Sequence, residues 1–258
     1  MHRKFPARSQ PTTRLAGHAG RMKFTTRRVV IGVAALAVLA VGGFAGVYLA
    51  LFNPKPVAVV ALPTPVAIPS SSAGGALAST GARWTIGAGS FVGYRVREQL
   101  ASLPAPSDAV GRTSAVSGGA TVTPNADGSV SVSAVTVKAD LTQLSSDSAR
   151  RDGFVQRNSL ETGSFPDASF VSTEAFTCPA SVVAGSAGST TIKGRFTIHG
   201  QTRDVSIPIQ VQRSGTAVNI VATYKFNWGD YGVQSPQVPV ASVQGSPVVE
   251  MSLALASA

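Results

Sequence analysis

The sequence has little of what catalytic and metal sites need. Its 258 residues include one cysteine, Cys178, and three histidines, of which only His199 lies beyond residue 52. A zinc site takes three or four His, Cys or acidic ligands, and a Ser-His-Asp triad would depend on His199 alone. A glycine-rich phosphate loop and a dinucleotide-binding fingerprint are also missing. We therefore expect a protein that is not an enzyme, with no catalytic residue, no metal ligand and no required cofactor.

Charge is scarce and unevenly placed. Only 13% of the residues are charged, and the formal net charge is +10. Residues 1–28 hold eight basic residues and no acidic one, whereas the remainder has 14 basic against 12 acidic residues. A basic tail can bind nucleic acid, but this one runs directly into an apolar stretch. It is therefore read as a cytoplasmic tail that sets membrane orientation, and no nucleic-acid partner is expected.

The apolar stretch spans residues 29–52 and contains no charged residue. A membrane helix needs about 20 apolar residues, so this run predicts a single transmembrane helix. The excess of Lys and Arg before it predicts a cytoplasmic N-terminus and an extracytoplasmic C-terminal domain in the cell membrane. The alternative is a cleaved signal and a secreted protein, but secretory apolar regions are about 7–15 residues long. Both interpretations place the C-terminal domain outside the cytoplasm.

A Pro/Ser/Gly/Ala-rich segment, residues 53–82, follows the apolar run. Proline-rich chain forms semi-rigid spacers and Ser/Gly-rich chain forms flexible ones, so a stalk is predicted here. The remaining residues, 83–258, form the predicted folded domain. With one cysteine in the chain, that domain has no intrachain disulfide and depends on its core for stability.

Apolar and polar residues alternate through most of this domain. Ile192, Phe196 and Ile198 share one face of a predicted strand, and the segments 205–211, 218–226 and 249–255 alternate in the same way. This period of two is typical of antiparallel strands with one buried face. Turn residues separate the runs at 124–128, 199–200 and 213–215. The apolar phase slips near Ala134 and Val135, which predicts a β-bulge.

One polar segment, residues 145–159, departs from the alternation and predicts a short helix capped by Ser146 or Asp147. Its charged residues allow two interpretations: a site for the polar head of a ligand, or ion pairs and caps that fix the helix. The charged residues concerned are Asp147, Arg150, Arg151 and Asp152. About eight or nine strands and one helix predict an all-β barrel or sandwich.

Several short motifs, taken in order, resemble the YceI-like family. They are Trp84-x-Ile86, Ser90-Phe91-Val92-Gly93-Tyr94, Val137-x-Ala139-Asp140-Leu141, Phe165-Pro166-x-Ala168-x-Phe170, Gly194-x-Phe196-Thr197-Ile198-His199-Gly200 and Trp228-Gly229-x-Tyr231-Gly232-Val233. The resemblance extends from about Arg83 to Ala258. It implies an extended, lipocalin-like antiparallel β-barrel of about eight strands, with a helix near its mouth and a long apolar pocket.

Members of that family are associated with polyisoprenoid lipids or quinones. The resemblance therefore implies a binding protein for a lipophilic long-chain molecule, and the apolar run with its basic tail predicts that this protein is membrane-tethered and extracytoplasmic, whereas known members are mostly free periplasmic or secreted proteins. The alternative is a structural or adhesion β-domain with a filled core, because an eight-stranded barrel is either filled by side chains or holds one small ligand. The candidate residues of the apolar pocket are Tyr94, Phe154, Phe165, Phe170, Phe196, Ile198, Phe226 and Trp228.

Overall fold

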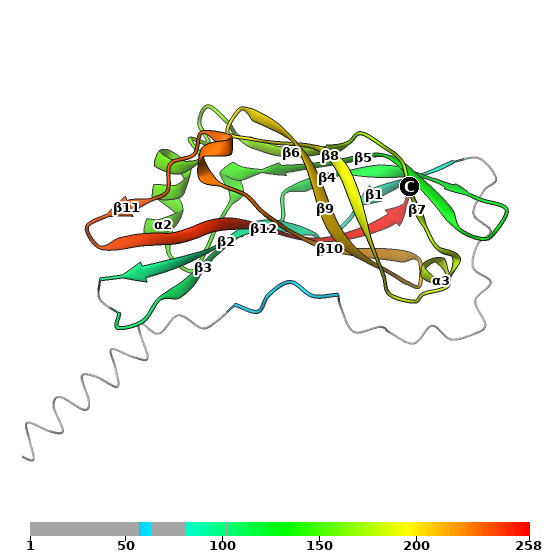
Figure 1. Ribbon diagram of the computed structural model, residues 1–258, viewed down its shortest axis with the longest axis horizontal. Coiled ribbons are helices and arrows are strands. Elements are labelled where there is room, and N and C mark those ends of the chain that lie inside the picture. Colours follow the sequence, from blue (N-terminus) through cyan, green and yellow to red (C-terminus); the bar gives the residue numbers. More distant parts are fainter. Residues whose placement is uncertain (1–56, 63–80, 102) are drawn as a thin grey trace, which may run out of the picture. The chain divides into compact units, whose positions relative to one another are not determined.

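The computed structural model describes residues 57–62, 81–101 and 103–258. Twelve strands form one antiparallel sheet (Figure 1). Their bounds, in chain order, are β1 Ala82–Ile86, β2 Phe91–Leu100, β3 Ser107–Thr113, β4 Val116–Pro124, β5 Val130–Asp140, β6 Asp167–Ser172, β7 Phe176–Cys178, β8 Gly188–Ile198, β9 Gln201–Ser214, β10 Ala217–Lys225, β11 Gln237–Val238 and β12 Ala241–Ser257.

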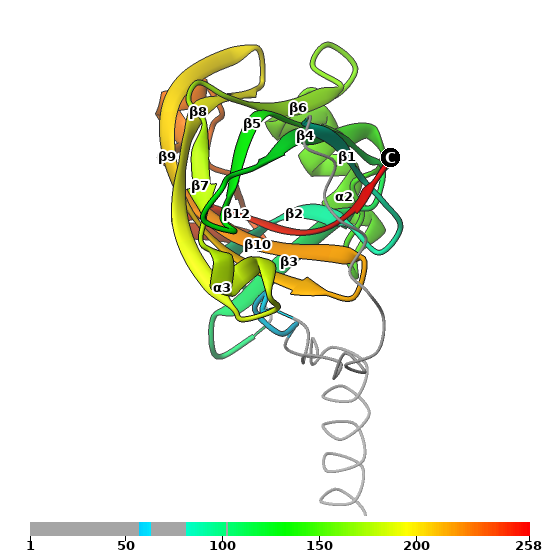
Figure 2. The ribbon, with the colours of Figure 1, turned by 90° about the vertical axis from the view of Figure 1, so that its right-hand side faces the viewer.

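The sheet closes on itself through β12. Strands pair in the order β1-β4-β5-β6-β8-β9-β10-β12, and β12 pairs again with β1 at Trp84–Ser257 to complete a ring of eight (Figure 2). Residues 241–252 of β12 pair instead with β2, which pairs with β3. Strands β2 and β3 therefore lengthen one end of the barrel. The predicted eight-stranded antiparallel barrel is confirmed.

The alternation seen in the sequence determines which side chains face the inside of the barrel. Along β8, Ile192, Phe196 and Ile198 are buried, whereas Lys193 and Arg195 are exposed. Burial of the apolar face of each strand stabilises the fold by about 25 cal/mol per Å² of apolar surface removed from water. Most buried apolar residues of β8, β9, β10 and β12 accordingly belong to one core, among them Ile192, Ile207, Ala222 and Leu253.

Tight connections keep neighbouring strands in register. The turn between β8 and β9 consists of His199, with φ 52°, and Gly200, with φ 69°. Two successive left-handed residues make the type of turn that matches the twist of a hairpin. The predicted bulge is also present, because Ala134 and Val135 together face Ala120, where the β4–β5 register shifts. Ala134 has a φ of 49°, which is the kink that the phase slip predicted.

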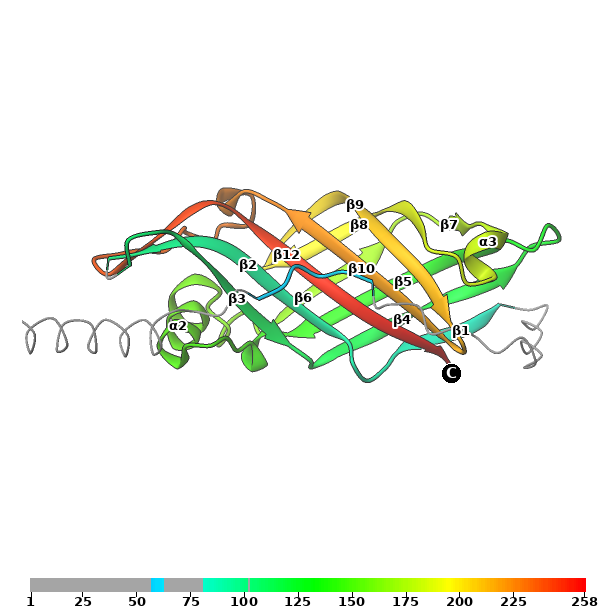
Figure 3. The ribbon, with the colours of Figure 1, turned by 90° about the horizontal axis from the view of Figure 1, so that it is seen from below.

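The helical elements lie at the two ends of the barrel (Figure 3). Helix α2, Ala149–Phe154, lies at the end extended by β2 and β3, and α3, Ala180–Val183, lies at the other end. The remaining helical turns are η1 Leu141–Gln143, η2 Val155–Ser159 and η3 Trp228–Tyr231. The predicted helix is confirmed, but its cap was predicted wrongly: the hydroxyl of Ser148, rather than Ser146 or Asp147, accepts from the Arg151 backbone N–H.

The predicted N-terminal tail 1–28 and transmembrane helix 29–52 lie outside the described residues. Within the described ranges, no helix has the length and apolar character needed to cross a bilayer. Of the predicted stalk 53–82, residues 57–62 and 81–82 are described, and Ala82 already belongs to β1. Two carbonyls of residues 57–62 contact the barrel wall.

Candidate functional site

Two cavities lie among the inward-facing side chains of the barrel. The larger, which we call the main cavity, has a volume of about 550 Å³ and is lined from β2, α2, β8 and the β10–β12 region. The smaller, which we call the inner cavity, has a volume of about 130 Å³ and is lined by residues of β1, α3, β9 and β12, Cys178 among them. A small-molecule site typically measures about 300–1,000 Å³, so the main cavity falls within that range.

The two cavities meet at the β6–β8 pair. Phe170 and Phe196 are direct partners in the register, yet Phe170 lines the inner cavity and Phe196 lines the main cavity. Gly194 makes room for the first ring, because a Cβ at this position would lie 2.5 Å from Cζ of Phe170. The two rings therefore mark the boundary between the cavities.

An aromatic cluster supports the wall of the main cavity. The Phe226 ring lies 5.0 Å from Tyr231 and 6.3 Å from Trp228, both edge-on, and Phe196 lies 5.5 Å from Tyr231. Tyr231 is fully buried, and burial and its hydrogen-bonding contact with the Tyr224 hydroxyl raise its pKa well above the usual value. Edge-to-face pairs of this kind are favourable beyond the area they bury, so this wall is firmly packed.

Most of the residues predicted for the pocket lie around one cavity. Six line the main cavity: Tyr94, Phe154, Phe196, Ile198, Phe226 and Trp228. Phe170 lines the inner cavity, so the structure places it apart from those six. That these seven contact a ligand stays a prediction.

Phe165 lines neither of these cavities. Its ring lies 4.6 Å from that of His199, over Gly200, where a Cβ would approach Phe165 Cε1 to 2.7 Å. Phe165 precedes β6, and its ring packs on the β8–β9 turn rather than into either cavity. The expected role of His199 as a turn residue is confirmed, and its Nδ1 lies 3.2 Å from the Tyr231 carbonyl.

The α2 end of the main cavity contains charged groups. Arg151 donates to Glu98 at 2.6 Å and to Ser146 at 3.2 Å, and it also pairs with Asp147. Asp152 accepts from the Ser146 hydroxyl at 2.6 Å. The ion pairs and caps of one interpretation are therefore present, and Arg150 and Arg151 also line the cavity.

Sequence reasoning missed Glu98, which is only 6% exposed. The signal was available, because Tyr94, Val96, Glu98 and Leu100 alternate along β2 and share its inward face. Arg95 and Arg97 occupy the intervening positions. A carboxylate on an inward face needs a cation, and Arg151 supplies it.

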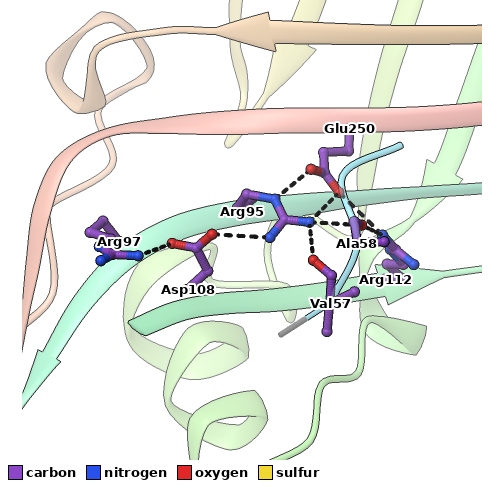
Figure 4. A network of polar contacts seen from close by, with 7 residues as sticks. All are labelled: Val57, Ala58, Arg95, Arg97, Asp108, Arg112 and Glu250. Atoms are coloured by element: carbon purple, nitrogen blue, oxygen red, sulfur yellow. Dashed lines mark hydrogen bonds and ion pairs between the residues drawn. The ribbon is translucent and has the colours of Figure 1, made fainter. Parts of the chain in front are cut away.

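A second charged cluster lies on the outer wall (Figure 4). Glu250 of β12 is 1% exposed, and Arg95 Nε donates to it at 2.6 Å while Arg112 donates at 3.3 Å. Arg95 also pairs with Asp108 at 3.2 Å. The same two arginines donate to backbone carbonyls of residues 57–62: Arg95 to Val57 and Ala58 at 3.0 Å, and Arg112 to Ala58 at 3.3 Å.

Across the ranges that the structure describes, no three His, Cys, Asp or Glu side chains come together in a way that could hold a metal ion. Cys178 is a free, buried thiol whose pKa is raised by burial. The main cavity thus has a mostly apolar lining, with a few polar groups at its α2 end.

Comparison with known proteins gives a clear family match. The family model described as the YceI-like domain matches residues 84–255. No curated protein sequence matches the chain.

Three solved structures are similar in fold. A polyisoprenoid binding domain from Saccharophagus degradans, implicated in plant cell wall breakdown, is 16% identical, with 69% of this chain and 99% of that chain covered and a TM-score of 0.49. BcnA of Burkholderia cenocepacia is 17% identical, with 65% and 96% covered and a TM-score of 0.46. The YCEI protein of Campylobacter jejuni is 13% identical, with 56% and 83% covered and a TM-score of 0.41.

Proposed function

The chain belongs to the YceI-like family, and from this premise we propose that its barrel binds a lipophilic long-chain molecule. The observation that carries the proposal is the main cavity, with its volume of about 550 Å³ and its mostly apolar lining. A barrel filled by its own side chains would leave no space of this size. Family membership makes a polyisoprenoid or quinone tail the first candidate.

Binding of this kind needs no reacting group. Apolar surface removed from water stabilises a complex by about 25 cal/mol per Å². Phe196, Ile198, Phe226, Val96 and Val249 all line the cavity and supply such surface. The proposed role is therefore carriage or storage of the molecule, with the barrel shielding its tail from water.

The test is the lipid content of the purified full chain. Native mass spectrometry of the protein extracted in mild detergent, followed by analysis of an organic extract, should show one molecule of a long-chain lipid per barrel. A chain that copurifies with no lipid and gains no thermal stability from added prenyl lipids would instead favour the structural-domain alternative.

We also propose that the barrel is tethered to the cell membrane on its extracytoplasmic side. Support comes from the apolar run 29–52 and the basic residues that precede it. Protease added to intact cells should release the domain by cutting between residues 70 and 82. A domain that stays protected while an N-terminal tag is digested would show the opposite orientation.

A further inference from the structure

We propose that the α2 end of the main cavity binds a neutral, oxygen-bearing head group, a hydroxyl or a carbonyl, through the hydroxyls of Tyr94 and Ser159. This inference rests on the proposed function, since it names the polar part of the same ligand. It separates two chemical classes of long-chain lipid: those that end in an alcohol or quinone, and those that end in a diphosphate.

The first observation is that two buried hydroxyls in the cavity lack partners. Tyr94 and Ser159 both line the main cavity, and within the described part of the chain neither hydroxyl oxygen has a hydrogen-bond partner. Ser159 is only 6% exposed. Both oxygens are buried in the ligand-free protein. Leaving a buried hydroxyl unpaired is unfavourable, so each would gain a partner from a ligand oxygen that displaces the atoms covering it.

The second observation is that the Tyr94 ring is held in place. Tyr94 on β2 is the direct partner of Gly111 on β3. A Cβ at Gly111 would lie 2.4 Å from Cε1 of the ring and 3.0 Å from its hydroxyl oxygen. The ring therefore packs closely on the bare backbone of β3, and a glycine is needed for it to do so.

The protonation state of this tyrosine suits a donor. Burial is the main reason that the pKa of Tyr94 is raised to about 12. The hydroxyl consequently keeps its proton at neutral pH and can donate it to a ligand oxygen. A serine hydroxyl donates or accepts equally well, so the pair can serve a carbonyl or an alcohol.

The charges at this end argue against an anionic head. Arg151 is already paired with the buried carboxylate of Glu98 and with Asp147. Arg150 is the one cation among the described lining residues that has no ion pair, and its side chain is exposed. A diphosphate would place at least two negative charges near Glu98 with one solvated cation to offset them, and like charges in a partly buried site repel strongly.

Three probes with the same fifteen-carbon tail test the proposal: farnesol, farnesyl diphosphate and the headless hydrocarbon farnesene. Their affinities for the full chain are measured by displacement of a fluorescent apolar dye, N-phenyl-1-naphthylamine. Farnesol should bind more tightly than either of the others. Tyr94→Phe and Ser159→Ala should each lower the affinity for farnesol by about 2- to 12-fold, which is the effect of one hydrogen bond. The affinity for farnesene should stay unchanged.

Two controls make the result specific. Tyr224→Phe removes a hydroxyl that contacts Tyr231 rather than the cavity, so farnesol affinity should stay at the wild-type value. Tyr94→Phe deletes only an unpartnered oxygen, so the melting temperature of the ligand-free protein should not fall. An unchanged melting temperature would show that a loss of farnesol affinity comes from the missing head-group contact and not from unfolding of the variant.

The outcomes are distinct. Farnesol affinity that is unchanged in both Tyr94→Phe and Ser159→Ala overturns the head-group proposal while the binding function stands. Tighter binding of farnesyl diphosphate than of farnesol also overturns it and points to Arg150 as the anchor. If wild-type protein binds none of the three probes, the proposed function itself fails, and the head-group site fails with it.

Discussion

Phe170 and Phe196 face each other across the β6–β8 pair, yet each ring lines a different cavity of the barrel. Phe196 is 5% exposed and packs edge-on against Tyr224 and Tyr231. The rings are thus both core residues and the partition inside the barrel. Changes at this point should affect stability and the length of chain that fits.

Phe196→Ala is expected to open the partition. Loss of a buried ring should lower the free energy of unfolding of the ligand-free protein by about 3–5 kcal/mol, because a cavity remains. A bound long-chain lipid should restore part of that loss by filling the space. Chemical denaturation with and without copurified lipid measures both effects. Equal losses in the two states would show that the ligand does not reach this ring.

Trp228→Ala is expected to behave differently from Phe226→Ala. Phe226 is buried within the aromatic cluster, whereas Trp228 is half-buried, lines the main cavity and donates its indole N–H to Gly245. Phe226→Ala should cost about 3–5 kcal/mol without ligand. Trp228→Ala should cost less and should mainly reduce the rise in melting temperature that ligand produces. If both variants, together with Phe196→Ala, collapse the ligand-free protein and no lipid stabilises the wild type, the binding function is wrong.

The Arg151–Glu98 pair is expected to hold α2 against the barrel. Removing one member leaves a buried charge without its partner, a change that typically costs about 3–5 kcal/mol. Arg151→Ala should therefore lower the unfolding free energy by an amount toward the lower end of that range, because 19% of the side chain is exposed. Arg150→Ala is the matched control: it removes the neighbouring, exposed arginine and should change stability by less than about 0.5 kcal/mol. Similar losses in both variants would contradict the assigned role.

Asp108 is expected to make a small part of the stability sensitive to acid. A hydrogen bond from Arg97, and another from Arg95, hold its pKa below the usual value of 3.8. A depressed folded-state pKa means that this stabilisation is complete above about pH 4 and is lost as the pH falls through the lower folded value. The melting temperature of Asp108→Asn should lie below that of the wild type at pH 6, and the gap should narrow below pH 3.8. Because the carboxylate is partly exposed, salt should also narrow the gap, whereas a gap that widens in acid would have the wrong sign.

Local features of the fold could be predicted from sequence because each depends on a pattern of neighbouring residues. Alternation in β8 identifies the inward face, and the phase slip at Ala134 and Val135 identifies the bulge. The pair His199-Gly200 identifies a tight turn because glycine tolerates a positive φ. These rules act within a few residues, so a single chain is enough to apply them.

Features formed between distant segments could not be predicted in the same way. Glu250 and Arg95 are 155 residues apart, and the acid points outward from β12, where a carboxylate is ordinarily solvated. Its burial follows from which strand becomes the neighbour of β12 and from residues 57–62 on the outside. The position of Phe165 likewise depends on packing against the β8–β9 turn, which lies more than 30 residues further along the chain.

The contacts of Val57 and Ala58 have a mechanical consequence. A pull on the chain from its N-terminal side reaches these two carbonyls before it reaches β1. Arg95 and Arg112 pass the load to Glu250 on β12, the longest strand, with 17 residues. The three hydrogen bonds from Arg95 and Arg112 to these carbonyls would therefore have to break before such a force reached the seam between β1 and β12, where the barrel closes.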